Sequence, residues 1–296
     1  MKIGFSILSH KAPNEIFVEL LRQLSKYPNT EIVIHHDFSK ADFDLGLNSK
    51  KNVYVIEKYE KTEWSHVNNI KALIKTFTIL YEQNCEWYIT LSANCYPIKP
   101  FNSLVEFLNT SEFDAYMECN NINSDYFDFY KYFRKALRTK YLFSIPFIKK
   151  TGEFYFKSIR VKRDEREIVF DANLVPYQGS DWFMINRKSM EYILANLKLI
   201  EDMCVFLSQV NKGPDLNLCP PEIVFQTLIA NNIELKKNND NYRYIDWTNS
   251  KEWHPNILVL KDFNKLKQSN AFFARKMNFP ESLELINKLN NSILDE

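Results

Sequence analysis

Apolar and polar residues in the first half of the chain alternate between a strand pattern and a helix pattern. Residues 2–9, 31–36 and 52–57 are short runs rich in apolar and β-branched side chains, which is typical of buried strands. Between the first two runs, apolar residues recur every three or four positions, which predicts an amphipathic helix that buries Leu20 and Leu24. Strands that alternate with helices in this way indicate an α/β fold with a mostly parallel sheet.

Helical and strand patterns continue along the rest of the chain. The further elements predicted are a helix at 66–82, a strand at 86–91, a helix after Pro100, a strand at 113–119, a strand at 181–186, a helix from Arg187, a helix after Pro221 and an extended segment at 242–246. No linker rich in Pro, Gly or Ser and no internal repeat separates these segments. We therefore expect residues 1–296 to form a single domain.

The middle of the chain differs in composition from both halves. Residues 123–166 are aromatic and basic, with few acidic side chains, and we expect a helical insert at about 121–170. Cations within 131–166 could attract an anionic acceptor or the surface of an anionic membrane. A pair of helices whose long basic side chains are simply solvated explains the same composition equally well.

The bulk composition is that of an ordinary globular protein, with 45% hydrophobic residues, 25% charged residues and a net charge of +1. We expect no nucleic-acid partner. The first residues have the pattern of a strand and not of an export signal, and no apolar stretch approaches the roughly 20 residues needed to cross a bilayer. Five cysteines without a Cys-x-x-Cys pair fit a reducing compartment. These observations predict a cytoplasmic protein, with a peripheral location at the inner face of the membrane as the alternative, and the Lys-, Asn- and Ile-rich composition suits a bacterial source.

Polar and aromatic residues follow each of the predicted parallel strands. They occupy positions 9–11, 35–37, 61–64 and 92–95. Any one of these loops is best explained as a solvated turn, since polar loops are the norm. In an open α/β sheet, however, ligands bind at the carboxyl ends of the strands, and four such loops at one edge predict a binding site there.

The sequence excludes several common kinds of catalytic site. With five glycines in the whole chain, neither a Gly-x-Gly-x-x-Gly fingerprint nor a P-loop is present. The five histidines are scattered without the spacing of a zinc site. The one Asp-x-Asp triplet, Asp42-Phe43-Asp44, does not follow a predicted strand, so we interpret it as a solvated turn and expect no metal.

Two weak signals remain for catalysis. Arg275 and Lys276 follow Phe273-Ala274, and adjacent cations of this kind can bind a diphosphate, although they are also common on surfaces. Glu222 follows Pro220-Pro221 at the start of a predicted helix. A carboxylate in a first helical turn is usually only a favourable partner of the helix dipole.

Taken in order, these and further motifs resemble the core-2/I-branching β-1,6-N-acetylglucosaminyltransferases and the related peptide O-xylosyltransferases. The resemblance covers most of the chain and is weakest from about 120 to 170. The segments that carry it are Leu8-Ser9-His10-Lys11, His35-His36-Asp37, Thr62-Glu63-Trp64, Leu91 to Lys99, Gly179 to Phe183, Pro221-Glu222 with Phe225-Gln226-Thr227, Tyr244 to Trp247, His254-Pro255 and Phe273 to Lys276.

The resemblance implies a glycosyltransferase A-type fold, inversion at the anomeric carbon and no metal or other cofactor. It implies a nucleotide-binding half at about 1–120 and an acceptor and catalytic half at about 171–296. Glu222 would be the general base, and Arg275 and Lys276 would stabilise the departing diphosphate. The nucleoside would contact His35, Asp37, Thr62 and Trp64, and the donor sugar or acceptor would contact Ser180, Asp181 and Trp182.

This sequence also departs from the family pattern. Cys95 occupies a position where the family usually has Asp, and Ser65-His66 replaces a frequent Gly-Gly pair. These changes concern the identity of the donor more than the class of reaction. We expect transfer of a sugar, with β-linked N-acetylglucosamine as the best guess, from a UDP-sugar to a cell-surface glycan precursor. The alternatives are a xylosyl- or hexosyltransferase of the same mechanism and an inactive module that binds sugar nucleotides or glycans.

Overall fold

The apolar runs of the sequence form the central strands of a mixed sheet. We describe a computed structural model of the chain over residues 1–44, 52–121, 159–163, 166–170, 174–210, 219–248, 250 and 254–294. The strand order is β12-β6-β11-β4-β1-β2-β3. The strands are β1 (Ile3–Ser9), β2 (Thr30–His36), β3 (Val53–Val55), β4 (Trp87–Ser92), β6 (Ala115–Tyr116), β11 (Met184–Asn186) and β12 (Lys237–Asn238). Only β11 runs antiparallel to its neighbours, so the predicted α/β class with a mostly parallel sheet is confirmed.

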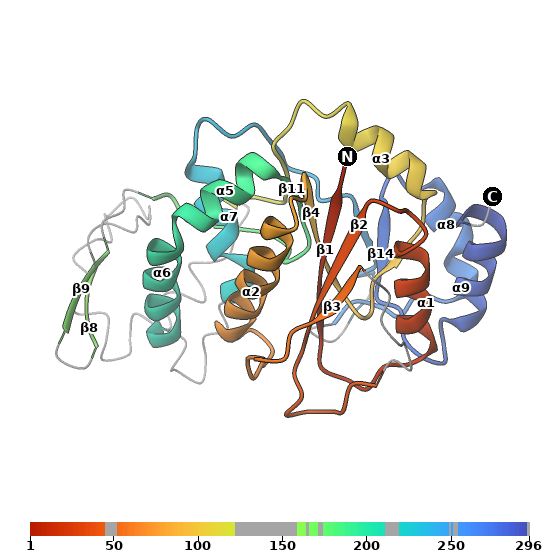
Figure 1. Cartoon of the computed structure of the whole chain (residues 1–296), viewed down its shortest axis with the longest axis horizontal. Coiled ribbons are helices and arrows are strands. Elements are labelled where there is room, and N and C mark those ends of the chain that lie inside the picture. The colour runs from red at the N-terminus through yellow and green to blue at the C-terminus, as the bar shows by residue number, and fades with distance from the viewer. Residues whose placement is uncertain are drawn as a thin grey trace.

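Helices cover both faces of this sheet (Figure 1). The helices are α1 (Glu15–Leu24), α2 (Asn68–Glu82), α3 (Phe101–Asn109), α5 (Arg187–Ala195), α6 (Leu197–Val210), α7 (Val224–Asn231), α8 (Phe263–Gln268) and α9 (Leu283–Leu289). Successive side chains of a strand point to opposite faces. Accordingly, Val33 packs with the core beneath α2, α5, α6 and α7, whereas Ile32 and Ile34 pack with the core beneath α1, α8 and α9.

Two local features explain how closely these layers approach. Asn14 caps α1 by accepting a hydrogen bond from the Phe17 backbone amide, which fixes where that helix begins. On the other face, a Cβ atom at Gly4 would lie 2.9 Å from Leu80 Cδ2, so glycine allows α2 to pack directly on β1. None of the helices in the described ranges is both long and apolar enough to cross a membrane.

A second, three-stranded sheet connects distant parts of the sequence. Its order is β13-β14-β5, with β13 (Arg243–Ile245) parallel to β14 (Phe273–Arg275) and β5 (Tyr96–Pro97) antiparallel to β14. Ile245 pairs with Arg275, and Arg243 pairs with Phe273. This pairing places Arg243 and Arg275 on adjacent strands, although the two arginines stand at the two ends of a 33-residue span of sequence.

Some predicted elements are shorter than expected. The strand predicted at 113–119 is β6 with two residues, and the strand predicted at 181–186 is β11 with three. The helix predicted after Pro221 begins with a separate 3₁₀ turn, η2 (Pro220–Glu222), and α7 follows it. The 3₁₀ turn η3 (Leu260–Asp262) similarly precedes α8, and the π-helical turn η4 (Asn290–Leu294) follows α9.

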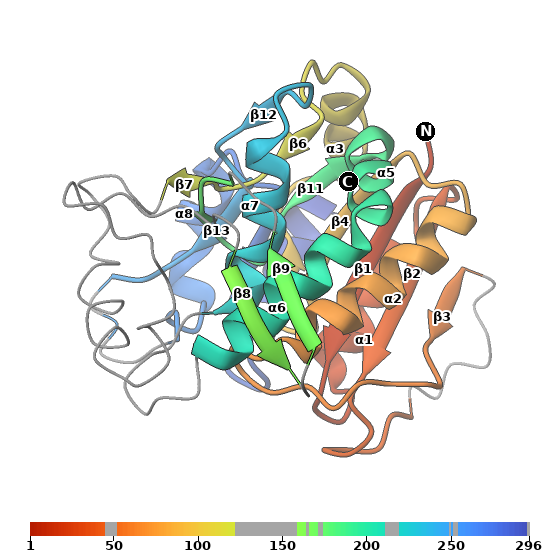
Figure 2. The same ribbon diagram turned by 90° about the vertical axis from the view of Figure 1, so that its left-hand side faces the viewer.

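The expectation of a helical insert at 121–170 is wrong for the described part of that segment. β8 (Ile159–Arg163) and β9 (Arg166–Phe170) form a two-stranded antiparallel sheet, which contacts α6 (Figure 2). A second small sheet pairs β7 (Asn120–Asn121) with β10 (Tyr177–Gln178). Residues 122–158, which carry most of the predicted basic surface for a membrane or an anionic acceptor, lie outside the described residues.

Candidate active site

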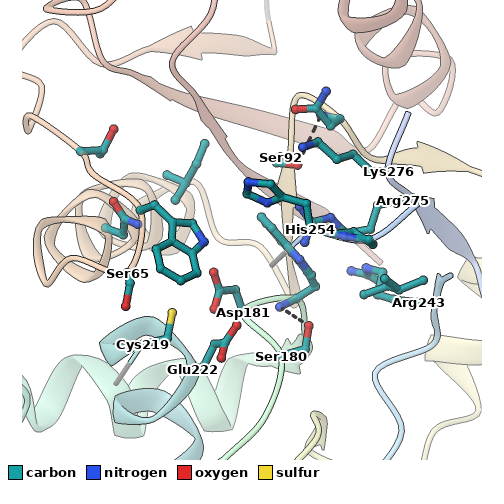
Figure 3. Close-up of a pocket in the computed structure, with 18 of the residues that line it drawn as sticks. Ser65, Ser92, Ser180, Asp181, Cys219, Glu222, Arg243, His254, Arg275 and Lys276 are labelled. Carbon is teal, nitrogen blue, oxygen red and sulfur yellow. Dashed lines mark hydrogen bonds between the residues drawn. The ribbon is translucent and has the colours of Figure 1, made fainter. Parts of the chain in front are cut away.

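A cavity of about 790 Å³ opens at the carboxyl ends of the parallel strands, at the edge where the sequence predicted a site. Its wall combines residues that follow β1, β3 and β4 with residues from the second half of the chain, including β13 and β14. Eight of the predicted site residues line it, namely Thr62, Trp64, Ser180, Asp181, Trp182, Glu222, Arg275 and Lys276. Figure 3 shows the carboxyl groups of Asp181 and Glu222 close together, with the arginines on another part of the wall.

Glu222 owes its position to the tight turn η2. The prolines at the first two positions of η2 suit the start of a helical turn, and the Glu222 amide donates to the Cys219 carbonyl oxygen at 2.9 Å. The Gly179 amide donates to the Glu222 carbonyl oxygen at 2.9 Å, and Gln178 Nε2 donates to Glu222 Oε2 at 3.1 Å. One carboxylate oxygen is thus held by a neutral donor. Glu222 also directly precedes Ile223, the N-cap of α7, where a helix dipole favours a negative charge.

Asp181 lies next to Glu222 in a tightly packed segment. A Cβ atom at Gly179 would lie 1.8 Å from the Glu118 carbonyl oxygen, so only glycine fits there. The Ser180 amide donates to Glu118 Oε2 at 3.1 Å, and Ser180 accepts a hydrogen bond from Gln226 at its carbonyl oxygen. These bonds fix the backbone that presents the Asp181 side chain to the cavity.

The electrostatic environment raises the pKa values of the two carboxyl groups. Burial raises the pKa of Glu222, and the neighbouring Asp181 charge raises it further, while Gln178 and Arg275 oppose the rise. Burial also raises the pKa of Asp181, which Arg275 partly offsets. Asp181 Oδ1 is buried and has no hydrogen-bond partner among the described residues. A carboxyl with a raised pKa in a cavity is typical of general acid and base catalysis.

The cations of the cavity include one that sequence reasoning missed. The Arg275 guanidinium lies over the Trp182 ring at 4.6 Å from its centre, and its buried Nε atom has no hydrogen-bond partner among the described residues. Arg243 also lines the cavity, although it is only 8% exposed. Its guanidinium donates to the carbonyl oxygens of Asn241 and Thr90 at 3.2 and 3.3 Å, and burial lowers its pKa to about 10. In the described part of the chain, neither Arg243 nor Arg275 forms an ion pair.

The sequence signal for Arg243 was too weak to single it out. Arg243 stands at the start of a predicted extended segment, without a second cation beside it. Only the pairing of β13 with β14 brings it next to Arg275. Lys276, in contrast, is adjacent to Arg275 in sequence and lines the same cavity.

The predicted nucleoside residues divide into two groups. Thr62 and Trp64 line the cavity, and the Trp64 side chain is 57% exposed. His35 and Asp37 are fully buried behind the wall, so the predicted direct contacts of these two residues with a nucleoside are not supported. His35 Nε2 accepts a hydrogen bond from the Glu60 amide at 2.8 Å.

Asp37 fastens the loop that carries Thr62. Its Oδ2 atom accepts from the Thr62 amide at 2.7 Å and from the Thr62 hydroxyl at 3.0 Å, and its Oδ1 atom accepts from the Ser39 amide and hydroxyl. A carboxylate has about four acceptor positions, and all are taken. Burial raises the pKa of Asp37, but the bonds from Ser39 and Thr62 outweigh it and lower the pKa to about 2. Asp37 therefore shapes the cavity from behind.

One group of side chains in the described residues could hold a metal ion. Ligand atoms of Asp181, Cys219 and Glu222 lie within 4.8 Å of one another. The Asp42-Phe43-Asp44 triplet does not line the cavity. The five cysteines form no disulfide.

Comparison with known proteins points to one family. The sequence model of the core-2/I-branching enzyme family matches residues 3–268. The chain is 24% identical over 286 residues to β-glucuronosyltransferase GlcAT14B of Arabidopsis thaliana, covering 90% of this chain and 61% of the relative. It is 26% identical over 265 residues to xylosyltransferase 1 of Mus musculus, covering 81% of this chain and 25% of the relative.

A third relative and a solved structure complete the comparison. A β-1,3-galactosyl-O-glycosyl-glycoprotein β-1,6-N-acetylglucosaminyltransferase 4 of Danio rerio is 21% identical over 201 residues, covering 66% of this chain and 44% of the relative. Mouse xyloside xylosyltransferase 1 aligns with 94% of this chain and 99% of its own at a TM-score of 0.39 and 10% identity. The chain spans between 25% and 61% of the length of these three curated relatives.

Proposed function

Because this chain belongs to the core-2/I-branching enzyme family, we propose that it is an inverting, metal-independent glycosyltransferase that moves a sugar from a UDP-sugar to a hydroxyl group of a glycan. Relatives named for glucuronosyl, xylosyl and N-acetylglucosaminyl transfer support this class of reaction. The proposed donor sugar is N-acetylglucosamine, transferred with β configuration to a cell-surface glycan precursor. Transfer of xylose or a hexose by the same mechanism is the alternative.

The observation that carries the proposal is the arrangement of charges around one cavity. Glu222 lines it, and so do Arg243, Arg275 and Lys276. An acceptor hydroxyl next to Glu222 would give up its proton to the carboxylate while its oxygen attacks the anomeric carbon of the donor. The bond from that carbon to the diphosphate breaks at the same time, and the electron pair leaves with UDP. Attack from the face opposite the leaving group inverts the anomeric carbon.

The cations act where negative charge develops on the leaving diphosphate. Arg275 is held in place by its contact with Trp182, and Arg243 by two backbone carbonyl oxygens, so neither has to reorganise greatly during the reaction. With no ion pair to another described side chain, both guanidinium groups keep donors for a substrate. Fixed arginines and a lysine can thus supply the charge neutralisation that a divalent cation supplies in other enzymes.

The nucleoside would bind at the opposite part of the wall. Thr62 and Trp64 are the predicted nucleoside residues that reach the cavity, and Asp37 holds Thr62 in position from behind. Trp64 offers an exposed aromatic face on which a base can stack. An inactive binding module could retain this wall. Binding alone, however, does not require a Glu222 carboxyl group with a raised pKa beside Arg243 and Arg275, which form no ion pair with a described side chain.

The proposal is tested by incubating the full chain with a panel of UDP-sugars in the presence of EDTA. The panel comprises the N-acetylglucosamine, xylose, glucuronic acid and glucose donors. A donor at 100 times its dissociation constant should stabilise the fold by about 2.7 kcal/mol, which a thermal shift detects. UDP release and transfer to glycan acceptors are then measured with that donor. An NMR spectrum should show a product of opposite anomeric configuration, and retention of configuration would refute the mechanism.

A variant separates the enzyme from a binding module. Glu222→Gln should keep the thermal shift with the preferred donor and lose transfer. Donor binding without transfer by the unmodified protein, across all donors and acceptors, would favour the binding module.

A further inference from the structure

Three potential metal ligands converge at the catalytic part of the cavity from two separate segments. Asp181 follows β10, whereas Cys219 and Glu222 flank the prolines of η2. One ligand atom from each lies within 4.8 Å of the other two, and all three residues line the cavity. Figure 3 shows the Cys219 sulfur beside the carboxyl groups of Asp181 and Glu222. The cluster combines one thiol with two carboxyl groups, so it is more than an accumulation of acidic residues.

A second observation concerns the hydrogen bonding of Asp181. Asp181 Oδ1 is buried and finds no hydrogen-bond donor among the described residues. A buried polar atom without a partner costs about 1–3 kcal/mol, so such atoms call for an explanation. Glu222 Oε2, in contrast, is oriented by Gln178, as metal-binding carboxylates commonly are by an outer partner.

We propose that Asp181, Cys219 and Glu222 form a site for a thiophilic divalent cation such as Zn²⁺, and that the bound cation inhibits glycosyl transfer by occupying the general base. The inhibitory part rests on the proposed function of Glu222, whereas cation binding stands independently of it. The site is distinct from a catalytic metal site because the cation would remove the base and not assist the leaving diphosphate.

The ligand chemistry selects the type of cation. Zinc binds thiolate sulfur at about 2.3 Å and carboxylate oxygen at about 2.0–2.2 Å, so tetrahedral ligand atoms lie about 3.5 Å apart. Side chains at a cavity wall need only small rotations to reach that spacing from a spread of up to 4.8 Å. A thiolate ligand favours zinc or cadmium over magnesium or manganese, which prefer sites made of oxygen ligands alone. Three protein ligands leave the fourth zinc position open to a water molecule of the cavity.

Binding is balanced by the release of protons. The Cys219 thiol must lose its proton to solvent to bind as a thiolate, and any proton on the Asp181 or Glu222 carboxyl group must leave as well. Binding should therefore strengthen as the pH rises, and zinc titration should release protons into the buffer. No oxidation or reduction is involved.

Binding is tested on the full chain without substrates, by calorimetric titration with ZnCl₂. A Co²⁺ titration adds a spectroscopic signature, because a thiolate ligand produces a charge-transfer absorption that carboxylates alone do not. Cys219→Ser should abolish that absorption and weaken zinc binding at least about 10–100-fold, the loss typical of removing even an outer partner of a ligand. Cys119→Ser is the matched control, since Cys119 is also half-buried but is not part of the cluster.

Several results would overturn the proposal. The first is an unchanged zinc affinity of Cys219→Ser. The second is a loss of zinc affinity in Cys119→Ser equal to that in Cys219→Ser, and the third is the absence of any zinc binding by the unmodified chain. Asp181→Asn provides a second variant that keeps the thiol and should also weaken binding. Melting temperatures of all variants identify losses that come from unfolding.

The inhibitory part is tested separately by transfer assays. Zinc should inhibit the unmodified protein reversibly, with recovery after EDTA, and the ratio of rates with and without zinc should move toward one in Cys219→Ser. Zinc binding without inhibition of an active enzyme refutes the inhibitory part. If no transfer occurs under any condition, the proposed function fails while the calorimetric result still decides on the metal site.

Discussion

At the nucleoside part of the cavity, the buried Asp37 carboxylate accepts four hydrogen bonds from Ser39 and Thr62, and its pKa falls to about 2. At the catalytic part, Asp181 Oδ1 and Arg275 Nε are buried, and no described residue forms a hydrogen bond with either atom, while the pKa values of the Asp181 and Glu222 carboxyl groups rise. The Asp37 carboxylate has its acceptor positions filled from within the protein. Asp181 Oδ1 and Arg275 Nε find no partner among the described residues.

This contrast separates two tasks that one cavity has to perform. A nucleoside is bound in the same form before and after the reaction, so a rigid wall fastened by internal hydrogen bonds suits it. The catalytic region must stabilise a charge distribution that exists only in the transition state. Each unsatisfied buried atom costs about 1–3 kcal/mol of stability, which substrate binding can offset. We therefore expect substitutions in the catalytic region to change turnover and those behind the nucleoside wall to change stability.

The largest expected effect is on turnover in Glu222→Gln. Glutamine keeps the size of the side chain and a hydrogen bond with Gln178, but it cannot accept the proton of the acceptor, so kcat should fall by about 10²–10⁴. UDP affinity should change little. Glu15→Gln is the matched control, because Glu15 is a first-turn carboxylate of α1 outside the cavity. Steady-state kinetics and melting curves are measured on both. Near-normal transfer by Glu222→Gln would exclude it as the base.

The next largest effect should follow from Arg275→Ala. Removal of one oxyanion-hole donor in acyl-transfer enzymes costs about 10²–10³ in kcat, and we expect a loss of the same order here. The matched control is Arg187→Ala, because Arg187 also lies over an aromatic ring, that of Tyr81 at 4.1 Å, but outside the cavity. If both variants lose the same stability and only Arg275→Ala loses turnover, the effect belongs to the site. If Arg275→Ala and Arg187→Ala have equal turnover, Arg275 does not take part in the mechanism.

On the nucleoside side, Asp37→Asn should mainly lower stability. Asparagine puts an amide donor against the Thr62 or Ser39 donors, and the shift of the Asp37 pKa from 3.8 to about 2 corresponds to about 2 kcal/mol at neutral pH. Because the folded pKa lies below the unfolded one, this stabilisation is complete above the unfolded pKa and is lost as the pH falls toward 2.

Urea unfolding of Asp37→Asn at pH 7 and across the acid range checks both statements. The variant should lose less stability than the unmodified protein between pH 4 and pH 2, since its side chain no longer titrates there. Asp42→Asn is the control, because Asp42 is exposed in the same loop region. If Asp42→Asn loses as much stability as Asp37→Asn, the charge of the loop in general and not the contact with Thr62 is responsible.

Much of this two-part cavity could be predicted from the sequence. The strands β1, β2 and β4 follow from apolar runs, and their carboxyl ends define the edge where Thr62 and Trp64 lie. Glu222 could be singled out only by resemblance, because its local pattern is that of any acidic residue after prolines. Its pKa is raised first by burial and then by Asp181, which lies 41 residues away in sequence.

What the sequence could not provide comes from long-range pairing. Arg243 reaches the cavity because β13 pairs with β14, and no local pattern encodes that partner. The saturation of Asp37 depends on a loop that returns 25 residues later, so a residue expected to touch ligand instead supports Thr62. The β8 and β9 pair replaced an expected helix because a basic and aromatic composition does not by itself define a period.

A smaller effect is expected for Trp64→Ala. Stacking of a base on an aromatic ring contributes about 1–3 kcal/mol, and we expect about 1 kcal/mol here because the ring stays 57% exposed in the absence of ligand. UDP should bind roughly fivefold more weakly by calorimetry, with the melting transition retained. Phe38→Ala, an exposed aromatic residue outside the cavity, should not change UDP binding. Equal UDP affinities of Trp64→Ala and Phe38→Ala would show that the uracil ring does not stack on Trp64.

The smallest expected effect is that of removing divalent cations, which should leave turnover unchanged. The reason lies in the catalytic region, where Arg243, Arg275 and Lys276 line the cavity and can neutralise a diphosphate without a metal. The Asp42-Phe43-Asp44 triplet, which could have held a bridging cation, does not line the cavity. Initial rates are measured in excess EDTA and after addition of Mg²⁺ or Mn²⁺. A rate that requires either ion would refute metal independence and would assign the Asp181 and Glu222 carboxyl groups to a catalytic metal. Equal rates in EDTA and in Mg²⁺, together with loss of rate in Zn²⁺, would instead show two things. The catalytic region uses fixed cations, and a metal ion bound at the general base Glu222 prevents transfer.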